Sequence, residues 1–216
     1  VYLSEISEIM GNTTPALVLI KKDGIKVEYS WSQYQKKVLQ AMIGLKTRNL
    51  KEGEFVAIIA LNLPESFFVM LGAILMGAVP VPINAMLLRE PGQTELKKIL
   101  DDCKPALVLG NKCLRSRLPS YDVISLEQIL AEGKEALGPP AINKRDPKEI
   151  LIMPYTSGTT GKPKGVMLSE ETILDRVTAV TGELSATDEE RVLSYLTLGH
   201  ISELIATFFG QIRRGY

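Results

Sequence analysis

Two short apolar segments near the N-terminus flank a turn. Residues 16–20 and 25–29 surround Asp23-Gly24. In the second segment, Ile25, Val27 and Tyr29 alternate with polar residues. Alternation beside an Asp-Gly pair predicts a β-hairpin, because the pair suits the tight turn and the alternation suits a half-buried strand.

A long amphipathic helix is expected directly after this hairpin. Ser30 and Gln33 have the spacing of a capping box, in which two residues satisfy each other's backbone N–H groups at a helix start. The apolar residues that follow recur every three or four positions, which is the helical period. They are Trp31, Tyr34, Val38, Ala41, Met42 and Leu45.

Strand-like and helix-like stretches alternate beyond this helix. Strands are expected at 55–60, 78–83 and 106–109, with helices at 65–76 and 94–103 between them. Strands and helices that take turns along a chain predict a parallel sheet. The sequence therefore predicts an α/β fold with a mostly parallel sheet flanked by helices.

A charged connector rich in Gly and Pro is expected at 133–149, after a short helix for which Ser125 and Gln128 form a second capping-box pattern. It is either a linker between domains or a loop within one domain. The elements expected after it are a strand at 150–153, a loop at 155–165, a strand at 166–168, a helix at 170–184 capped by Ser169, a strand at 192–196 and a helix at 200–213.

Composition narrows the class of protein. The 216 residues are 45% hydrophobic and 23% charged, as in an average globular chain. The 25 basic residues match the 25 acidic ones, so no surplus positive charge favours a nucleic-acid partner. The two cysteines, Cys103 and Cys113, suggest neither a disulfide framework nor a zinc site, and we interpret both as reduced thiols.

One uncharged stretch, residues 66–88, is long enough to suggest a membrane span. Pro80, Pro82 and Asn84 argue against it and favour a buried helix followed by a buried strand, so no transmembrane segment is expected. Residues 1–10 lack the basic start and apolar block of a signal peptide, so a cytoplasmic location is expected by default.

The loop from Tyr155 to Gly165 concentrates the groups that bind polyphosphate. Its sequence YTSGTTGKPKG supplies Ser and Thr hydroxyls, three glycines and two lysines between apolar strands. Glycines let backbone N–H groups turn inward, hydroxyls add donors, and lysine adds positive charge. The loop is not a Walker A motif, because Gly158 and Gly161 enclose two residues and Pro163 follows Lys162.

This eleven-residue string resembles the signature loop of the adenylate-forming superfamily, which includes acyl-CoA synthetases, luciferases and peptide-synthetase adenylation domains. Residues 62–84 resemble an early helix–strand segment of the same family. Residues 193–203 resemble the segment that in long-chain acyl-CoA synthetases contains His-Ile-x-Glu, although Thr197 stands where that pattern has proline.

The resemblance implies roles for individual residues. His200, the one histidine of the chain, would lie beside the substrate carboxylate and act in catalysis by positioning it, while Glu203 would support that segment structurally. Lys164 would add charge beside the phosphates, and the Thr159 hydroxyl would also contact magnesium. The residues implied to hold the β and γ phosphates of ATP are Thr156, Ser157, Gly158, Thr159, Thr160 and Gly161.

The implied reaction joins a carboxylate, above all a long-chain fatty acid, to AMP as an acyl-adenylate and then transfers it to coenzyme A. ATP, Mg²⁺ and coenzyme A are the implied cofactors and co-substrates. Residues 1–216 would form a partial N-terminal AMP-binding domain, without the C-terminal half and small lid domain of the family, and this chain alone is expected to be inactive.

Two other functions stay open at this stage. The chain could belong to an adenylation module that acts on another carboxylate or loads a carrier protein, or to a truncated protein that binds without catalysis. The sequence leaves open the acyl chain length, the oligomeric state and peripheral contact with a membrane.

Overall fold

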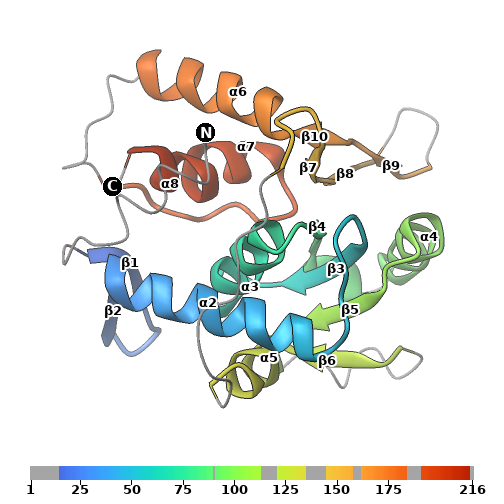
Figure 1. The fold of residues 1–216 in the computed structure, drawn as a ribbon, viewed down its shortest axis with the longest axis horizontal. Helices are drawn as coiled ribbons and strands as arrows, with labels where there is room; N and C mark the ends of the chain where they lie inside the picture. The colour runs from blue at the N-terminus through green and yellow to red at the C-terminus, as the bar shows by residue number, and fades with distance from the viewer. Residues whose placement is uncertain are drawn as a thin grey trace.

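The chain folds around a four-stranded sheet in which all neighbouring strands are parallel (Figure 1). A computed structural model describes residues 15–89, 91–112, 121–134, 145–157, 162–183 and 191–214. The strand order is β4-β3-β5-β6. The predicted parallel sheet is confirmed, and its strands are β3 (Phe55–Ala60), β4 (Val79–Asn84), β5 (Leu107–Gly110) and β6 (Val123–Ser125).

Helices cover both faces of this sheet. The helix α3 (Pro64–Leu75) connects β3 to β4, and α4 (Gln93–Cys103) connects β4 to β5, with a short 3₁₀ turn η1 (Ala85–Leu88) between β4 and α4. Along β3, Val56 and Ile58 belong to the core that contains α3, whereas Ala57 and Ile59 belong to the core that contains α4. A strand buried on both faces reads as a continuous apolar run, as β3 does.

The predicted hairpin and helix at the start of the chain are confirmed. The strands β1 (Pro15–Ile20) and β2 (Lys26–Ser30) pair antiparallel, and α2 (Trp31–Thr47) follows directly. Gln33 N donates to Ser30 Oγ at 3.2 Å, and Ser30 N donates to Gln33 Oε1 at 2.9 Å, so the capping box forms in full.

The second predicted capping box forms only in part. Gln128 N donates to Ser125 Oγ at 3.1 Å at the start of α5 (Leu126–Glu132), but the Gln128 side-chain amide donates to Glu132 at 2.9 Å. Ser125 thus caps the helix, while Gln128 supports the ion pair that Glu132 makes with α2.

The helices after the connector share the apolar core that contains α2 and α3, whereas β7 and β8 contact β4, and β9 contacts α4 (Figure 1). Phe208 lies against Phe67 of α3, with ring centroids 6.0 Å apart, and one apolar core includes residues from both sides of the connector. In chain order these elements are β7 (Ile150–Ile152), β8 (Tyr155–Thr156), β9 (Lys164–Gly165), β10 (Leu168–Ser169), α6 (Glu170–Glu183), α7 (Ile201–Glu203), η3 (Leu204–Phe209) and α8 (Gly210–Arg214).

Two sequence predictions for this part are wrong. No strand forms at 192–196, because within the described residues no strand pairs with this segment, and side chains bind it instead. The strand expected at 166–168 is confined to β10, which pairs antiparallel with β7. The helix expected at 200–213 is present, but its middle, η3, is π-helical.

Arg145, at the end of the connector, binds to the turn before β4. Its side chain is 3% exposed, and Nη2 donates to the Gly77 carbonyl oxygen at 2.5 Å. Its Nε lies 3.7 Å from a carboxylate oxygen of Glu149. Burial lowers the pKa of this guanidinium, opposed by the neighbouring Glu149. The connector therefore leads directly into contacts with the central sheet.

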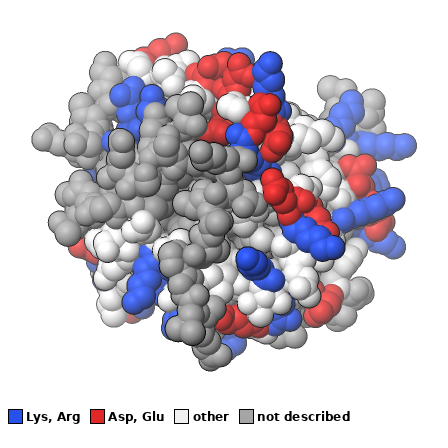
Figure 2. Space-filling view, viewed as in Figure 1, with Lys and Arg blue, Asp and Glu red and all other residues white. Residues whose placement is uncertain are grey.

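The uncharged stretch divides into α3 and β4, as the prolines predict. Among the helices within the described residues, none combines the length and apolar character of a membrane span. On the face shown in Figure 2, basic and acidic side chains lie next to one another, in keeping with the balanced composition.

The helices α2 and α5 approach each other closely at Gly44. A Cβ atom added to Gly44 would lie 2.0 Å from the Ile129 carbonyl oxygen, which is backbone that cannot rotate away. We expect Gly44→Ala to lower the free energy of unfolding by about 2 kcal/mol or more, measured by urea denaturation. The control is Gly182→Ala in α6, where no atom lies within 4 Å of the added Cβ. It should be neutral or stabilising by up to about 1 kcal/mol. Equal stability of the two variants would contradict the close approach.

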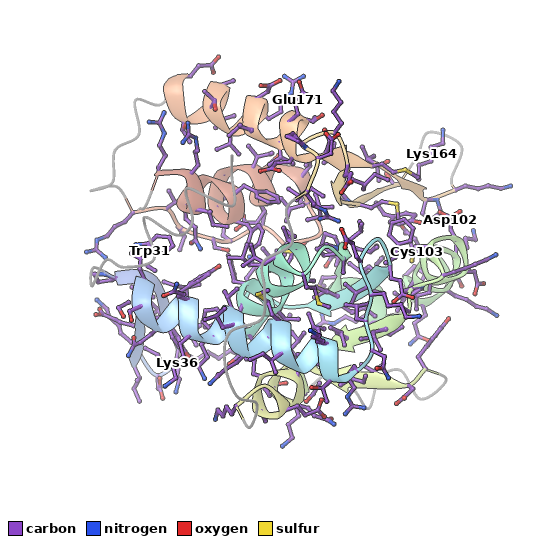
Figure 3. The ribbon with its side chains drawn as sticks, in the orientation of Figure 1. Trp31, Lys36, Asp102, Cys103, Lys164 and Glu171 are labelled. Atoms are coloured by element: carbon purple, nitrogen blue, oxygen red, sulfur yellow. The ribbon has the colours of Figure 1, made fainter. Side chains whose placement is uncertain are left out.

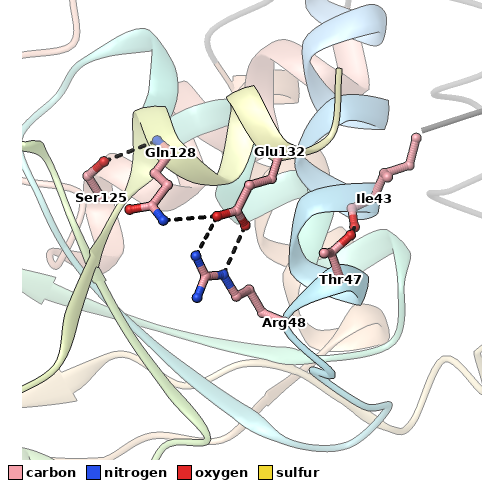
Figure 4. Close-up of polar contacts among 6 residues, drawn as sticks. All are labelled: Ile43, Thr47, Arg48, Ser125, Gln128 and Glu132. Atoms are coloured by element: carbon pink, nitrogen blue, oxygen red, sulfur yellow. Dashed lines mark hydrogen bonds and ion pairs between the residues drawn. The ribbon is translucent and has the colours of Figure 1, made fainter. Parts of the chain in front are cut away.

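An ion pair joins the C-terminal end of α2 to α5 (Figure 4). Arg48 donates to both carboxylate oxygens of Glu132, through Nε at 2.9 Å and through Nη2. This bidentate contact is the main reason that the pKa of Glu132 is lowered. The pair therefore stabilises the fold above the ordinary pKa of a glutamate, and this contribution disappears as the pH falls through the lowered value.

A double-mutant cycle with Arg48→Gln and Glu132→Gln should give a coupling energy of about 0.5–1 kcal/mol at pH 7, because both side chains are partly exposed. The coupling should decrease as the pH falls through the lowered pKa of Glu132 and the carboxylate becomes protonated. A coupling that does not change with pH would show that the contact is not ionic.

Candidate functional site

The predicted phosphate loop begins and ends in a small hairpin. In the strands β8 and β9, Tyr155 pairs with Gly165, and Thr156 pairs with Lys164. The side chains of Thr156, Ser157 and Lys164 are exposed, so their hydroxyl and ammonium groups are free to meet a ligand. The predicted site residues Gly158, Thr159, Thr160 and Gly161 lie outside the described residues.

The base of this hairpin rests on the central sheet. Met153 N donates to the Pro80 carbonyl oxygen of β4 at 3.0 Å, and Val166 N donates to the Pro154 carbonyl oxygen at 2.8 Å. A Cβ at Gly165 would lie 2.9 Å from the Met153 sulfur, so the returning strand packs closely against the outgoing one. The exposed loop therefore has a buried, well-connected base.

A side-chain contact ties the hairpin to α4. The Tyr155 hydroxyl donates to a carboxylate oxygen of Asp102 at 2.5 Å. Figure 3 shows Asp102 and Cys103 at the end of α4, below Lys164. Burial, followed by the hydrogen bond to Asp102, raises the pKa of Tyr155 above its ordinary value, so the hydroxyl stays a neutral donor. No local pattern indicates this pairing, since the two residues are 53 positions apart in the chain.

Cys103 is a buried thiol beside this contact. Burial raises its pKa to about 11, so the sulfur is protonated at neutral pH and not a strong nucleophile. This agrees with its interpretation as a reduced thiol that serves packing. Cys113 lies outside the described residues.

His200 forms the N-cap of the helix that begins with α7. Its Nδ1 accepts a hydrogen bond from Ser202 N at 3.3 Å. A ring nitrogen that accepts a hydrogen bond carries no proton, so a neutral imidazole here has its proton on Nε2. The side chain is exposed, which leaves Nε2–H available to a ligand. The geometry makes His200 suitable as a hydrogen-bond donor.

The backbone before His200 lies against the carboxyl end of β4. A Cβ at Gly199 would lie 2.9 Å from Asn84 N, so only a glycine fits here without displacement of the backbone. The hairpin base reaches the same strand at Pro80. Asn84 comes four positions after Pro80 along the strand, which is a distance of about 13 Å. The base of the loop and the segment before His200 thus contact the same strand, β4, at two separate positions.

Two residues outside the predicted site organise the segment before His200. Asn62 and Glu203 together make hydrogen bonds to Ser194, Leu196 and Leu198. The expectation that Glu203 has a structural role agrees with its 2% exposure. The sequence analysis did not predict this role for Asn62. One signal could have indicated it, because Asn62 is a polar residue that soon follows the buried strand β3, and ligand sites of parallel sheets lie at the carboxyl ends of the strands.

Comparisons with known proteins agree with this arrangement. The sequence profile of the family described as AMP-binding enzyme matches residues 11–216. Long-chain-fatty-acid–CoA ligase ACSBG1 of Bos taurus is 31% identical over an alignment of 224 residues, which covers 90% of this chain and 30% of that protein. ACSBG2 of Homo sapiens, another long-chain-fatty-acid–CoA ligase, is 31% identical over 228 residues, covering 94% of this chain and 34% of that protein.

A solved structure shares the fold. The fatty acyl-adenylate ligase from L. pneumophila, in complex with acyl adenylate and pyrophosphate, superposes with a TM-score of 0.84. The match covers 99% of this chain and 39% of that one, at 22% identity. The chain spans about a third of the length of the curated relatives it matches. Because the family profile extends over nearly the whole sequence and the fold agrees with it, this chain belongs to the AMP-binding enzyme family.

Proposed function

We propose that this chain is the N-terminal part of an acyl-CoA synthetase that activates a carboxylate as its acyl-adenylate and transfers the acyl group to coenzyme A. The observation that carries the proposal is the hairpin on β4, which presents Thr156, Ser157 and Lys164 to solvent at the start and end of the signature loop. Identity of about 30% to two long-chain-fatty-acid–CoA ligases supports a long-chain fatty acid as the substrate.

The chemical difficulty of this reaction is the approach of two anions, a carboxylate and the α-phosphate of ATP. Lys164 and the hydroxyls of Thr156 and Ser157 are suited to hold the β and γ phosphates and to offset the charge that develops on departing pyrophosphate. Preorganised donors stabilise a transition state because they need no rearrangement during reaction. The packed base of the hairpin supplies this preorganisation.

Magnesium would accompany ATP and offset further phosphate charge. Thr159, the residue that the family resemblance assigns to the metal, lies outside the described residues. Within the described part of the chain, no three His, Cys, Asp or Glu side chains lie together as metal ligands. In this proposal the ATP phosphates and the Thr159 hydroxyl would hold the metal.

His200 would orient the carboxylate. Its Nε2–H can donate to a carboxylate or acyl oxygen, while Nδ1 is occupied by Ser202 N. A carboxylate is already ionised at neutral pH, so the step requires no proton transfer from the histidine. Positioning by a fixed donor is enough to favour attack on phosphorus.

Pyrophosphate exchange tests the proposal directly. ATP, Mg²⁺ and a panel of fatty, aryl and amino acids would be incubated with labelled pyrophosphate and either this chain or the product of the complete reading frame that contains it. We expect exchange with fatty acids in the longer product and none in the 216-residue chain. Exchange only with aryl or amino acids would indicate another adenylation module, and none with any acid would indicate a binding protein.

Lys164→Ala in the complete protein should raise the KM for ATP about tenfold or more, because a charge-assisted hydrogen bond contributes roughly 1.5–3 kcal/mol. The matched control is Lys26→Ala, since Lys26 is also an exposed lysine in a hairpin strand but lies in β2. Its KM should not change. An unchanged KM in Lys164→Ala would remove this residue from the phosphate site.

Tyr155→Phe should raise the KM for ATP several-fold, because the hairpin loses its bond to α4, whereas Asp102→Asn retains an acceptor oxygen and should have a smaller effect. The raised pKa of Tyr155 keeps its hydroxyl protonated at neutral and mildly basic pH, so the Tyr155→Phe effect should be the same from about pH 6 to 9. A pH-dependent effect within this range would show that the hydroxyl ionises.

A further inference from the structure

The segment before His200 pairs with no strand of the described structure, and it ends in a turn in which His200 N donates to the Thr197 carbonyl oxygen at 2.8 Å. The side-chain amide of Asn62 binds it instead. Nδ2 donates to Ser194 Oγ at 2.8 Å and to the Leu196 carbonyl oxygen, and Leu198 N donates to Oδ1 at 3.2 Å. These contacts span 132 to 136 positions of sequence.

The three contacts fall on alternate residues. Because the chain bends at Leu196 and turns at Leu198, a side chain can reach all three groups where a straight neighbouring strand could not. Both amide hydrogens and the carbonyl oxygen of Asn62 are in use. Its backbone position is fixed because it follows β3, and α3 begins two residues later.

Glu203 holds the same segment from within the helix that follows. Ser194 Oγ donates to Oε1 at 2.5 Å, and Leu196 N donates to Oε2 at 3.2 Å. Thr207 Oγ1 also donates to Oε1, at 2.7 Å. A carboxyl group that is 2% exposed requires such partners, because a buried polar group without hydrogen bonds is costly. Residues 194–198 are thus clamped between Asn62 and Glu203.

The clamp determines where His200 begins its helix. Leu198 is bonded to Asn62, Gly199 packs against Asn84 N, and His200 comes next. Its N-cap geometry fixes the imidazole relative to the backbone. A displacement of residues 194–198 would therefore also move the His200 imidazole, because only Gly199 lies between Leu198 and His200.

We infer that Asn62 is a positioning residue for the carboxylate step, because its amide holds residues 194–198 in the bent conformation that leads into the turn before His200. This inference rests on the proposed function. Asn62 is expected to affect the carboxylate and not ATP, since the hairpin assigned to the phosphates contacts β4 at Pro80 and does not contact Asn62 through any hydrogen bond described above. Loss of the amide should affect the use of the carboxylate and leave ATP binding intact.

Asn62→Ala and Asn62→Asp, in the complete protein, test this inference by pyrophosphate exchange. The aspartate is nearly isosteric and retains an acceptor for Leu198 N but loses both donated bonds. We expect kcat/KM for the fatty acid to fall about tenfold or more in both variants, with the KM for ATP within about twofold of the unaltered protein. Hydrogen exchange of the Leu198 amide should accelerate in Asn62→Ala, which removes its acceptor.

The control for a general loss of stability is Thr181→Val. The Thr181 hydroxyl donates to the Val177 carbonyl oxygen at 2.8 Å and accepts from Arg214 Nε at 3.0 Å, within the α6 and α8 helices. This variant should lower the melting temperature without a selective effect on the fatty acid. Unchanged kcat/KM in Asn62→Ala, or an equal loss toward ATP, would overturn the positioning role alone. An unaltered complete protein that is inactive with every carboxylate would overturn the proposed function and this inference with it.

Discussion

The position of the candidate site depends on β4, an edge strand of the described sheet that pairs with β3 on one side and has no parallel neighbour on the other. Val79, Val81 and Ile83 direct their backbone groups toward β3, and the intervening Pro80 and Pro82 direct theirs outward. Proline has no N–H, so the outer edge of β4 can accept hydrogen bonds at these two positions but cannot donate them. The parallel sheet ends there, and the edge is left to other contacts.

The candidate site occupies that edge. The strand before the loop contacts β4 through the Pro80 carbonyl oxygen, and the segment before His200 contacts it at Asn84. A rigid strand with six paired residues thus sets the separation between the groups assigned to phosphate and to carboxylate. The side chains that complete each half, Asp102 and Asn62, come from segments at the carboxyl ends of α4 and β3.

Local patterns in the sequence predicted the elements whose interactions are local. The capping box at Ser30 and the apolar run of β3 are examples, because neighbouring residues satisfy the cap and both faces of the strand are buried. The strand expected at 192–196 failed for the opposite reason. Its pattern is that of a strand, but a strand needs a neighbour, and in the described structure the segment instead bends at Leu196 and binds the Asn62 side chain. Contacts between residues far apart in sequence, such as Tyr155 with Asp102, leave no trace in the local pattern.

The π-helical geometry of η3 affects which insertions and deletions the helix can tolerate. A π-turn accommodates one residue more than an α-turn, so deletion of a single residue from 204–209 would leave a regular α-helix that is easily formed. A deletion from a regular α-helix rotates everything after it by about 100°, the angle that each residue turns the chain. In the π-turn the extra residue is absorbed locally, so the helix on either side would keep nearly the same orientation and Phe208 could stay in the core. Residues 204–209 are therefore a place where the helix is expected to tolerate a change of one residue in length.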